Sequence, residues 1–204
     1  MPKTIRNQYD KYLTYENLMK AHIKSRKNKS FRKEIILFNL KQEEYIMWLY
    51  NQLKTGKYKH GGYSIFYVTE PKLRKIEKSK YIDRIVHRWY VDSFIAPNYI
   101  PQFISTSYAC IKNRGMHKAC LGVQSGMKHC KQIWNDYYIL KMDVAKFFNN
   151  IDKRILLKIL KRKIKDKKVL WLTKEIIYSN YKENGIKGLP IRKLYITDIC
   201  QHIS

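Results

Sequence analysis

The chain has 204 residues, of which 45% are hydrophobic, so it holds enough apolar material to fold around a core. Lysine and arginine number 42 against 16 aspartates and glutamates, a formal net charge of +26. Such a surface repels itself unless a polyanion neutralises it, which makes nucleic acid the expected partner and an anionic membrane surface the alternative. No apolar run reaches the ~18 residues of a membrane span, and the N-terminus lacks a secretory pattern, so we expect a cytoplasmic protein.

The first half of the chain is predicted to contain helices followed by a hairpin. Residues 5–27 have a helical but largely polar pattern, and residues 43–53 carry apolar side chains at helical spacing. Gly61-Gly62 then breaks the chain. Residues 63–69 are rich in β-forming residues and predict a strand, which a turn at Glu70-Pro-Lys72 joins to a returning strand over 73–78.

The second half is predicted to be mainly helical around one buried strand. Asp83 to Phe94 has an apolar helical face, and Pro97 and Pro101 are expected to end that helix. The remaining predicted elements are helices over 117–133, 155–164 and 169–178, and a buried strand over 137–142. Helices that outnumber strands, with a hairpin and a central strand, predict an α+β fold.

Asp143 is the leading candidate for chemistry. It follows the predicted strand within Lys-Met-Asp-Val-Ala-Lys-Phe-Phe-Asn-Asn-Ile (141–151). Taken alone, an aspartate here is more simply an N-cap or turn residue. In context the segment resembles the first catalytic motif of reverse transcriptases. The resemblance implies that Asp143 and the Val144 carbonyl bind Mg²⁺ in the complete enzyme, and that Phe148 packs under the sugar of a deoxynucleotide.

The predicted hairpin resembles the fingers hairpin of the same enzymes. Lys72 and Arg74 alternate with Leu73, so they can share one face. The resemblance implies that they bind the β- and γ-phosphates of the incoming deoxynucleotide triphosphate. Arg84, in Asp-Arg-Ile-Val, fits a family position and serves either structure or template contact. The alternative for the hairpin is a solvated basic surface.

A basic loop precedes the predicted helix over 117–133. Its sequence, Ser-Tyr-Ala-Cys-Ile-Lys-Asn-Arg-Gly-Met-His-Lys-Ala (107–119), resembles a segment of bacterial reverse transcriptases, although Asn113 stands where the family has glycine. Lys112, Arg114 and Lys118 are therefore candidates for binding a nucleic-acid backbone. The alternative is a basic loop without a defined ligand.

The fourth segment is Lys-Gly-Leu-Pro-Ile (187–191), where Gly188 and Pro190 open a family motif that supports the nascent base pair. Four such residues alone are more simply a Gly-Pro turn. The pattern breaks at Arg192. Codons permitted for 192–204, read from the second base of the Arg192 codon, can encode Gly-Asn-Tyr-Thr-Ser-Gln-Ile-Phe-Ala-Asn-Ile-Tyr, which continues the motif. We therefore expect a frame change after Ile191.

The four segments occur in family order and imply an N-terminal helical region (1–60), fingers (61–136) and an incomplete palm sheet (137–204) of a right-hand polymerase. We expect an N-terminal fragment of a Mg²⁺-dependent RNA-directed DNA polymerase, inactive alone because the Tyr/Phe-x-Asp-Asp motif is absent. Ile191 favours the diversity-generating retroelement type. The expected partners are template RNA, primer or cDNA, and an accessory protein, with no membrane. The alternatives are a non-catalytic basic RNA-binding module and, ranked last, a membrane-surface protein.

Overall fold

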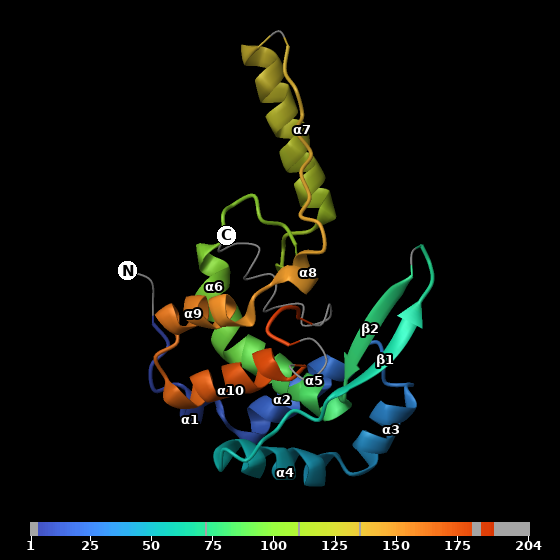
Figure 1. Ribbon diagram of the computed structural model, residues 1–204, viewed down its shortest axis with the longest axis vertical. Coiled ribbons are helices and arrows are strands. Elements are labelled where there is room, and N and C mark those ends of the chain that lie inside the picture. Colours follow the sequence, from blue (N-terminus) through green and yellow to red (C-terminus); the bar gives the residue numbers. More distant parts are fainter. Residues whose placement is uncertain (1–3, 72, 110, 135, 181–184, 190–204) are drawn as a thin grey trace.

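The computed structural model describes residues 4–71, 73–109, 111–134, 136–180 and 185–189. It has a helical body, from which a β-hairpin and a long helix project (Figure 1). The helices of the body are α1 (Tyr9–Tyr12), α2 (Tyr15–Arg26), α3 (Lys33–Leu40), α4 (Gln42–Lys54), α5 (Tyr81–Tyr90), α6 (Ala96–Tyr99), α8 (Phe147–Asn150), α9 (Lys153–Lys163) and α10 (Lys167–Tyr178). The predicted helices over 43–53, 155–164 and 169–178 are confirmed as α4, α9 and α10, whereas α3 was not predicted.

The core of the body is built around α5 and the helical turns that follow it. Ile85, Trp89, Tyr90 and Phe94 are each at most 1% exposed, and each such side chain contributes roughly 1.5–3 kcal/mol by leaving water. The Trp89 indole N–H donates a hydrogen bond to the Tyr12 carbonyl at 3.0 Å, so the polar edge of the ring is satisfied. Helix α2 packs against α5, and α4 packs against α2.

The N-terminal segment is divided into two short helices, so the prediction of helix over 5–27 is correct only in part. The break falls at Leu13 and Thr14, because the Thr14 side chain accepts a hydrogen bond from the Asn17 N–H at 3.2 Å and starts α2 as an N-cap. Ahead of α1, Ile5 forms a parallel bridge with Ile164, at the end of α9. The bridge thereby fastens the segment ahead of α1 to the end of α9.

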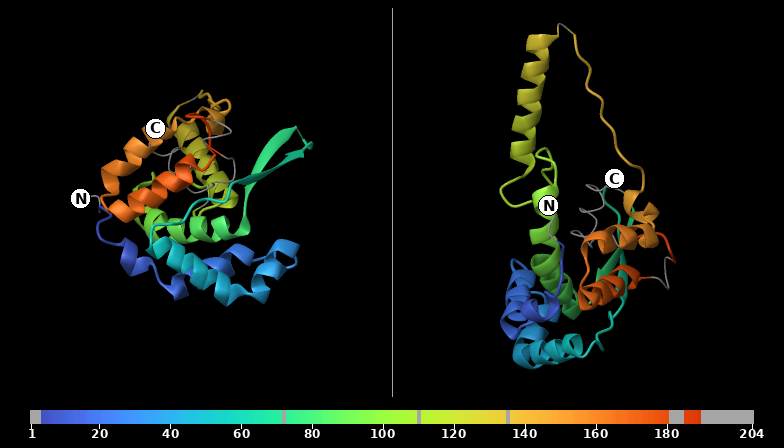
Figure 2. Two further views of the ribbon diagram at one scale, coloured as in Figure 1. Left: turned by 60° about the horizontal axis from the view of Figure 1, so that its bottom comes forward. Right: turned by 90° about the vertical axis from the view of Figure 1, so that its left-hand side faces the viewer.

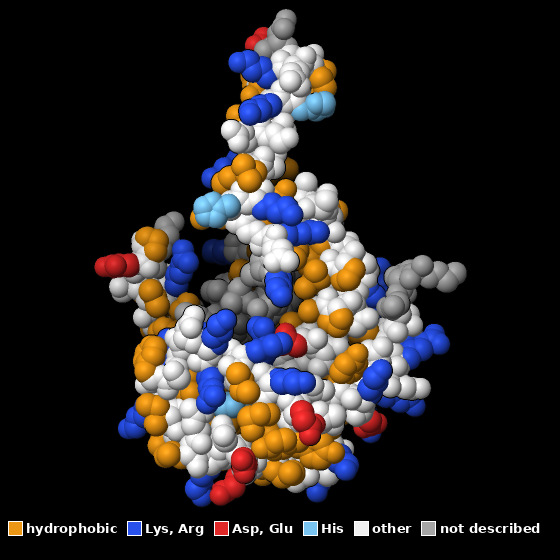
Figure 3. All heavy atoms as spheres, turned by 180° about the vertical axis from the view of Figure 1, so that it is seen from behind, with side chains coloured by type: hydrophobic (Ala, Val, Ile, Leu, Met, Phe, Trp, Pro, Cys, Tyr) orange, Lys and Arg blue, Asp and Glu red, His pale blue; other side chains and the backbone are white. Residues whose placement is uncertain are grey.

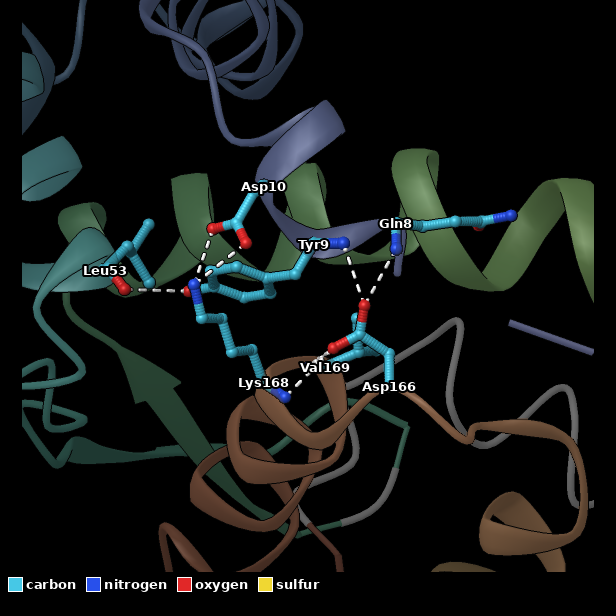
Figure 4. Close-up of polar contacts among 7 residues, drawn as sticks. All are labelled: Gln8, Tyr9, Asp10, Leu53, Asp166, Lys168 and Val169. Atoms are coloured by element: carbon cyan, nitrogen blue, oxygen red, sulfur yellow. Dashed lines mark hydrogen bonds and ion pairs between the residues drawn. The ribbon is translucent and has the colours of Figure 1, made fainter. Parts of the chain in front are cut away.

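Asp166 completes that connection (Figure 4). One carboxylate oxygen accepts hydrogen bonds from the Gln8 and Tyr9 N–H groups, at 2.8 and 3.0 Å. The other accepts from the Lys168 and Val169 N–H groups, at 3.0 and 3.2 Å, and so caps α10. A single side chain therefore satisfies amides at the starts of two helices that are far apart in sequence.

The predicted hairpin is confirmed. β1 (Tyr63–Val68) pairs with β2 (Arg74–Ser79) in an antiparallel two-stranded sheet, with Phe66 opposite Ile76. Lys78, near the end of β2, forms an ion pair with Glu34 of α3 at 2.9 Å between Nζ and Oε1. The hairpin is thus joined to the body at its base, while its tip extends away (Figure 1).

The prediction that Pro97 and Pro101 end the helix after Phe94 is wrong. Helix α5 continues through a π-helical segment (Val91–Ile95) into α6 and then a 3₁₀ turn (Ile100–Gln102). Both prolines occupy the first positions of a new helical segment, where their missing N–H has no partner to lose and their φ angle is already helical.

The predicted helix over 117–133 is confirmed as α7 (Met116–Ile133), but the buried strand over 137–142 is wrong. Helix α7 projects from the body with no buried side chain, and residues 136–146 return toward the body as exposed, extended chain (Figure 2). Tyr138 is 98% and Leu140 78% exposed. A strand needs a neighbour for its backbone groups, and the described residues provide no partner for this segment.

Candidate functional site

Asp143 lies in exposed chain just before α8. It does not cap that helix, because Lys146 occupies the N-cap position, with a φ of +50°. The turn is held by Asn150, whose side-chain amide donates to the Ala145 carbonyl at 3.3 Å. The N-cap interpretation of Asp143 is therefore wrong, and the carboxylate is accessible to a ligand.

The two aromatic residues of the motif begin α8. Phe147 and Phe148 are half-buried, with ring centroids 5.5 Å apart and planes at 75°. Asp143 and Val144, two of the predicted site residues, are both exposed, and the half-buried aromatic pair follows them at the start of α8. The roles of Asp143, Val144 and Phe148 in binding metal and nucleotide stay predictions.

The Gly-Leu segment near residue 188 returns onto the same helix. The Leu189 N–H donates to the Phe148 carbonyl at 2.9 Å, and the Gly188 N–H donates to the Ile151 carbonyl at 2.9 Å. Leu189 is 3% exposed, and Gly188 has a φ of +87°, which a residue with a Cβ adopts only with strain. Two motifs separated by about forty residues of sequence are therefore in direct backbone contact. Pro190 lies outside the described residues.

The base of the hairpin is anchored by a buried carboxylate that the sequence analysis did not assign. Asp83 is 1% exposed and accepts hydrogen bonds from the Tyr58 hydroxyl at 2.7 Å and from the Gly61 N–H at 3.1 Å. Burial and the adjacent Asp83 carboxylate raise the pKa of Tyr58. The Tyr63 hydroxyl lies 2.6 Å from Ser179, just after α10, and adds a second attachment. These contacts fix where β1 leaves the body.

Of the residues predicted to bind the triphosphate, Arg74 is exposed at the start of β2, and Lys72 lies outside the described residues. Arg84 was predicted to serve either structure or template contact, and its contacts are structural. Its guanidinium lies 2.6 Å from Glu34 Oε1 and 5.0 Å from the centre of the Tyr81 ring. Burial alone would raise the pKa of Glu34, but the hydrogen bonds from Lys78 and Arg84 outweigh it and lower that pKa.

In the basic loop before α7, one cation holds the loop together and the others are exposed to solvent. Arg114 donates to the Ile104 and Ser107 carbonyls, at 3.2 and 3.1 Å, and so closes the loop. Lys112 and Lys118 are exposed and accessible to a phosphate. Asn113 has a φ of +63°, a left-handed conformation that asparagine tolerates better than most residues.

Seen from behind, Lys and Arg side chains lie along the edges of the region between the hairpin and the base of α7 (Figure 3). The described residues contain no group of three His, Cys, Asp or Glu side chains that could hold a metal ion. Asp143 and the Val144 carbonyl are suitable ligands for one Mg²⁺, but they do not complete a two-metal site. Within the described ranges, no helix is both long and apolar enough to cross a membrane.

The sequence matches no protein-family model, and a search of curated proteins finds no match either. The function therefore has to be argued from the residues and their arrangement.

Proposed function

We propose that this chain is the fingers and the first part of the palm of a reverse transcriptase, an RNA-directed DNA polymerase. The observation that carries the proposal is the contact between the Asp143 motif and the Gly188 motif, through the bonds from Leu189 to Phe148 and from Gly188 to Ile151. The contact holds residues 188 and 189 against α8, shortly after Asp143, as expected if both segments contribute to one active site.

Three further features support the assignment. The hairpin forms where a fingers hairpin is expected, and its base is fixed by Asp83. The Asp143 carboxylate is exposed and does not cap α8. The net charge of +26 suits a template–primer duplex, because cations along a groove release counterions from phosphates.

In this proposal different residues bind the metal ion, the nucleotide and the nucleic-acid backbone. Asp143 and the Val144 carbonyl hold Mg²⁺, which would supply electrostatic stabilisation to phosphoryl transfer. Phe148 supports the sugar, and Arg74 pairs with the triphosphate as a bidentate donor. The backbone of the nucleic acid is contacted by exposed Lys112 and Lys118, while Arg84 and Arg114 shape the surface around it.

The 204 residues contain no aromatic-x-Asp-Asp sequence, so we propose that this chain does not synthesise DNA alone. The missing carboxylates would be encoded in the alternative reading frame after Ile191. Two observations test this part. The nucleotide sequence should read Gly-Asn-x-x-Ser-Gln in that frame and contain an aromatic-x-Asp-Asp codon run downstream. Purified 204-residue chain should give no incorporation on poly(rA)/oligo(dT), and robust incorporation would contradict the proposal.

Catalysis is tested in the frame-restored protein. Asp143→Ala should lower incorporation about a hundredfold or more, because several kcal/mol of charge stabilisation by the metal are lost, and should leave RNA affinity nearly unchanged. Asp136→Ala is the matched control, since Asp136 is also an exposed aspartate ahead of α8. Equal activity of the two variants would refute the role of Asp143.

The second candidate function is a non-catalytic RNA-binding module, which the high positive charge favours. It predicts that the frame-restored protein binds RNA and yet incorporates no nucleotide. Nucleotide incorporation that depends on Asp143 would favour the polymerase over the RNA-binding module.

A further inference from the structure

Helix α9 carries a row of cations that the proposed polymerase site does not use. Lys158, Lys161 and Arg162 are exposed, and their spacing of three and four residues puts them on one side of the helix axis. Lys165, two residues past the end of α9, is exposed as well. Lys167, at the start of α10, extends the row. We call these five residues the α9 ridge. Helix α9 lies on the opposite side of the body from the hairpin (Figures 1 and 2).

The ridge is not neutralised by nearby carboxylates. Between residues 153 and 168 the one acid is Asp166, which is buried and already accepts four backbone hydrogen bonds. Within the described part of the chain, no ridge side chain forms an ion pair with an acid. By contrast, the buried Lys153 and Lys163 donate to backbone carbonyls, so the structure uses those two cations for folding. The five ridge cations remain available to a polyanion.

The form of the helix favours nucleic acid over a lipid surface. A basic helix binds a membrane by inserting its apolar face. The apolar face of α9 is buried in the core instead, where Leu156 and Leu160 are 2% and 0% exposed. The ridge can therefore attract phosphates, but the buried apolar face of α9 cannot insert into a membrane.

A pocket lies beside the last ridge residue, between α1, the end of α4 and the start of α10. It has a volume of about 280 Å³ and is lined by Tyr9, Trp171, Lys54, Lys167 and Lys168, among others. Trp171 is half-buried and offers an aromatic surface, while Lys168 is paired with Asp10 at 2.7 Å. An aromatic side chain beside lysines is the combination that binds an unpaired base together with its phosphate.

We propose that the α9 ridge and the Trp171 pocket form a second nucleic-acid site, which holds single-stranded RNA with its backbone along the ridge and one base in the pocket. The site does not depend on the polymerase assignment, because none of its residues belongs to the candidate active site. It would serve either proposed function by holding RNA away from the hairpin.

The backbone contacts are tested on the 204-residue chain by fluorescence anisotropy with labelled oligo(rU), at several salt concentrations. The variant Lys158→Gln/Lys161→Gln/Arg162→Gln/Lys165→Gln should bind at least about tenfold more weakly near 0.1 M salt and flatten the log–log salt slope by about 3. The control Lys27→Gln/Lys29→Gln/Lys57→Gln/Lys59→Gln removes the same charge from exposed loops and should change affinity by less than about threefold. An equal loss of oligo(rU) affinity in both variants would overturn the proposal that the ridge binds RNA.

The base pocket has a separate readout. Trp171→Leu should weaken oligo(rU) binding roughly fivefold, leave the salt slope unchanged, and leave binding of a blunt RNA duplex unchanged. Wild-type affinity of this variant for oligo(rU) would overturn the pocket. Ridge-dependent binding to phosphatidylserine vesicles without binding to oligo(rU) would overturn the choice of RNA. Circular dichroism of each variant confirms that it has folded.

Discussion

Replacing Asp166 tests whether one carboxylate fastens the N-terminal segment to α10. In Asp166→Ala, α10 loses its N-cap, which costs about 1 kcal/mol. The Gln8 and Tyr9 N–H groups also lose their acceptor. The buried Tyr9 amide then costs about 1–3 kcal/mol, and the half-buried Gln8 amide costs about 1 kcal/mol. The expected loss in the free energy of unfolding is therefore about 3–5 kcal/mol, which lowers Tm by roughly 10 °C in a domain of this size.

Asp166→Asn gives an intermediate case, since the amide keeps one oxygen and so satisfies one of the two helix starts. It should lose about half as much stability as the alanine variant. Asp10→Ala is the matched control, because Asp10 is exposed and pairs with Lys168 at the surface, which is worth less than about 1 kcal/mol. The measurement is thermal and urea unfolding followed by circular dichroism at pH 7. If Asp166→Ala unfolds within 1 kcal/mol of wild type, or if Asn and Ala are equally damaging, the reasoning from these four bonds fails.

Three other perturbations have expected outcomes. Gly188→Ala should lower Tm by a few degrees through backbone strain (about 1 kcal/mol), whereas Gly126→Ala, in the middle of exposed α7, should not lower it. Tyr58→Phe should lower the free energy of unfolding by about 1–3 kcal/mol, because buried Asp83 loses a hydrogen-bond donor. The measurement is Tm, which should fall in this variant. Burial and then nearby Arg26 lower the pKa of His22, so the unfolded chain takes up the proton first and stability falls as pH drops below about 6.5; His22→Gln should reduce that slope in Tm measured from pH 8 to 5.5.

Local patterns predicted the elements whose signals are complete within a short stretch of sequence. The β-forming runs on either side of Glu70-Pro71 produced β1 and β2, and the apolar spacing produced α4, α9 and α10. Asp166 caps α10, a role that the sequence analysis did not assign. The strand predicted to end at Asp143 did not form, and the role of Asp143 stays a prediction.

The failures arise where the outcome depends on a partner far away in sequence. The residues 137–142 have the composition of a buried strand but no neighbouring strand in the described chain, so they remain extended and exposed. Composition could not reveal that Asp83 would accept bonds from Tyr58 and Gly61, because that contact exists only after α5 packs beside the start of β1.

By itself the sequence determined a basic, helix-rich chain with one hairpin and an aspartate-aromatic motif, because charge and periodicity are local properties. Only the tertiary structure decided that Gly188 and Leu189 return to the backbone of α8, that Arg84 pairs with Glu34, and that α9 lies on the opposite side of the body from the hairpin. Those outcomes depend on which faces are buried against one another, and burial is a property of the whole folded chain.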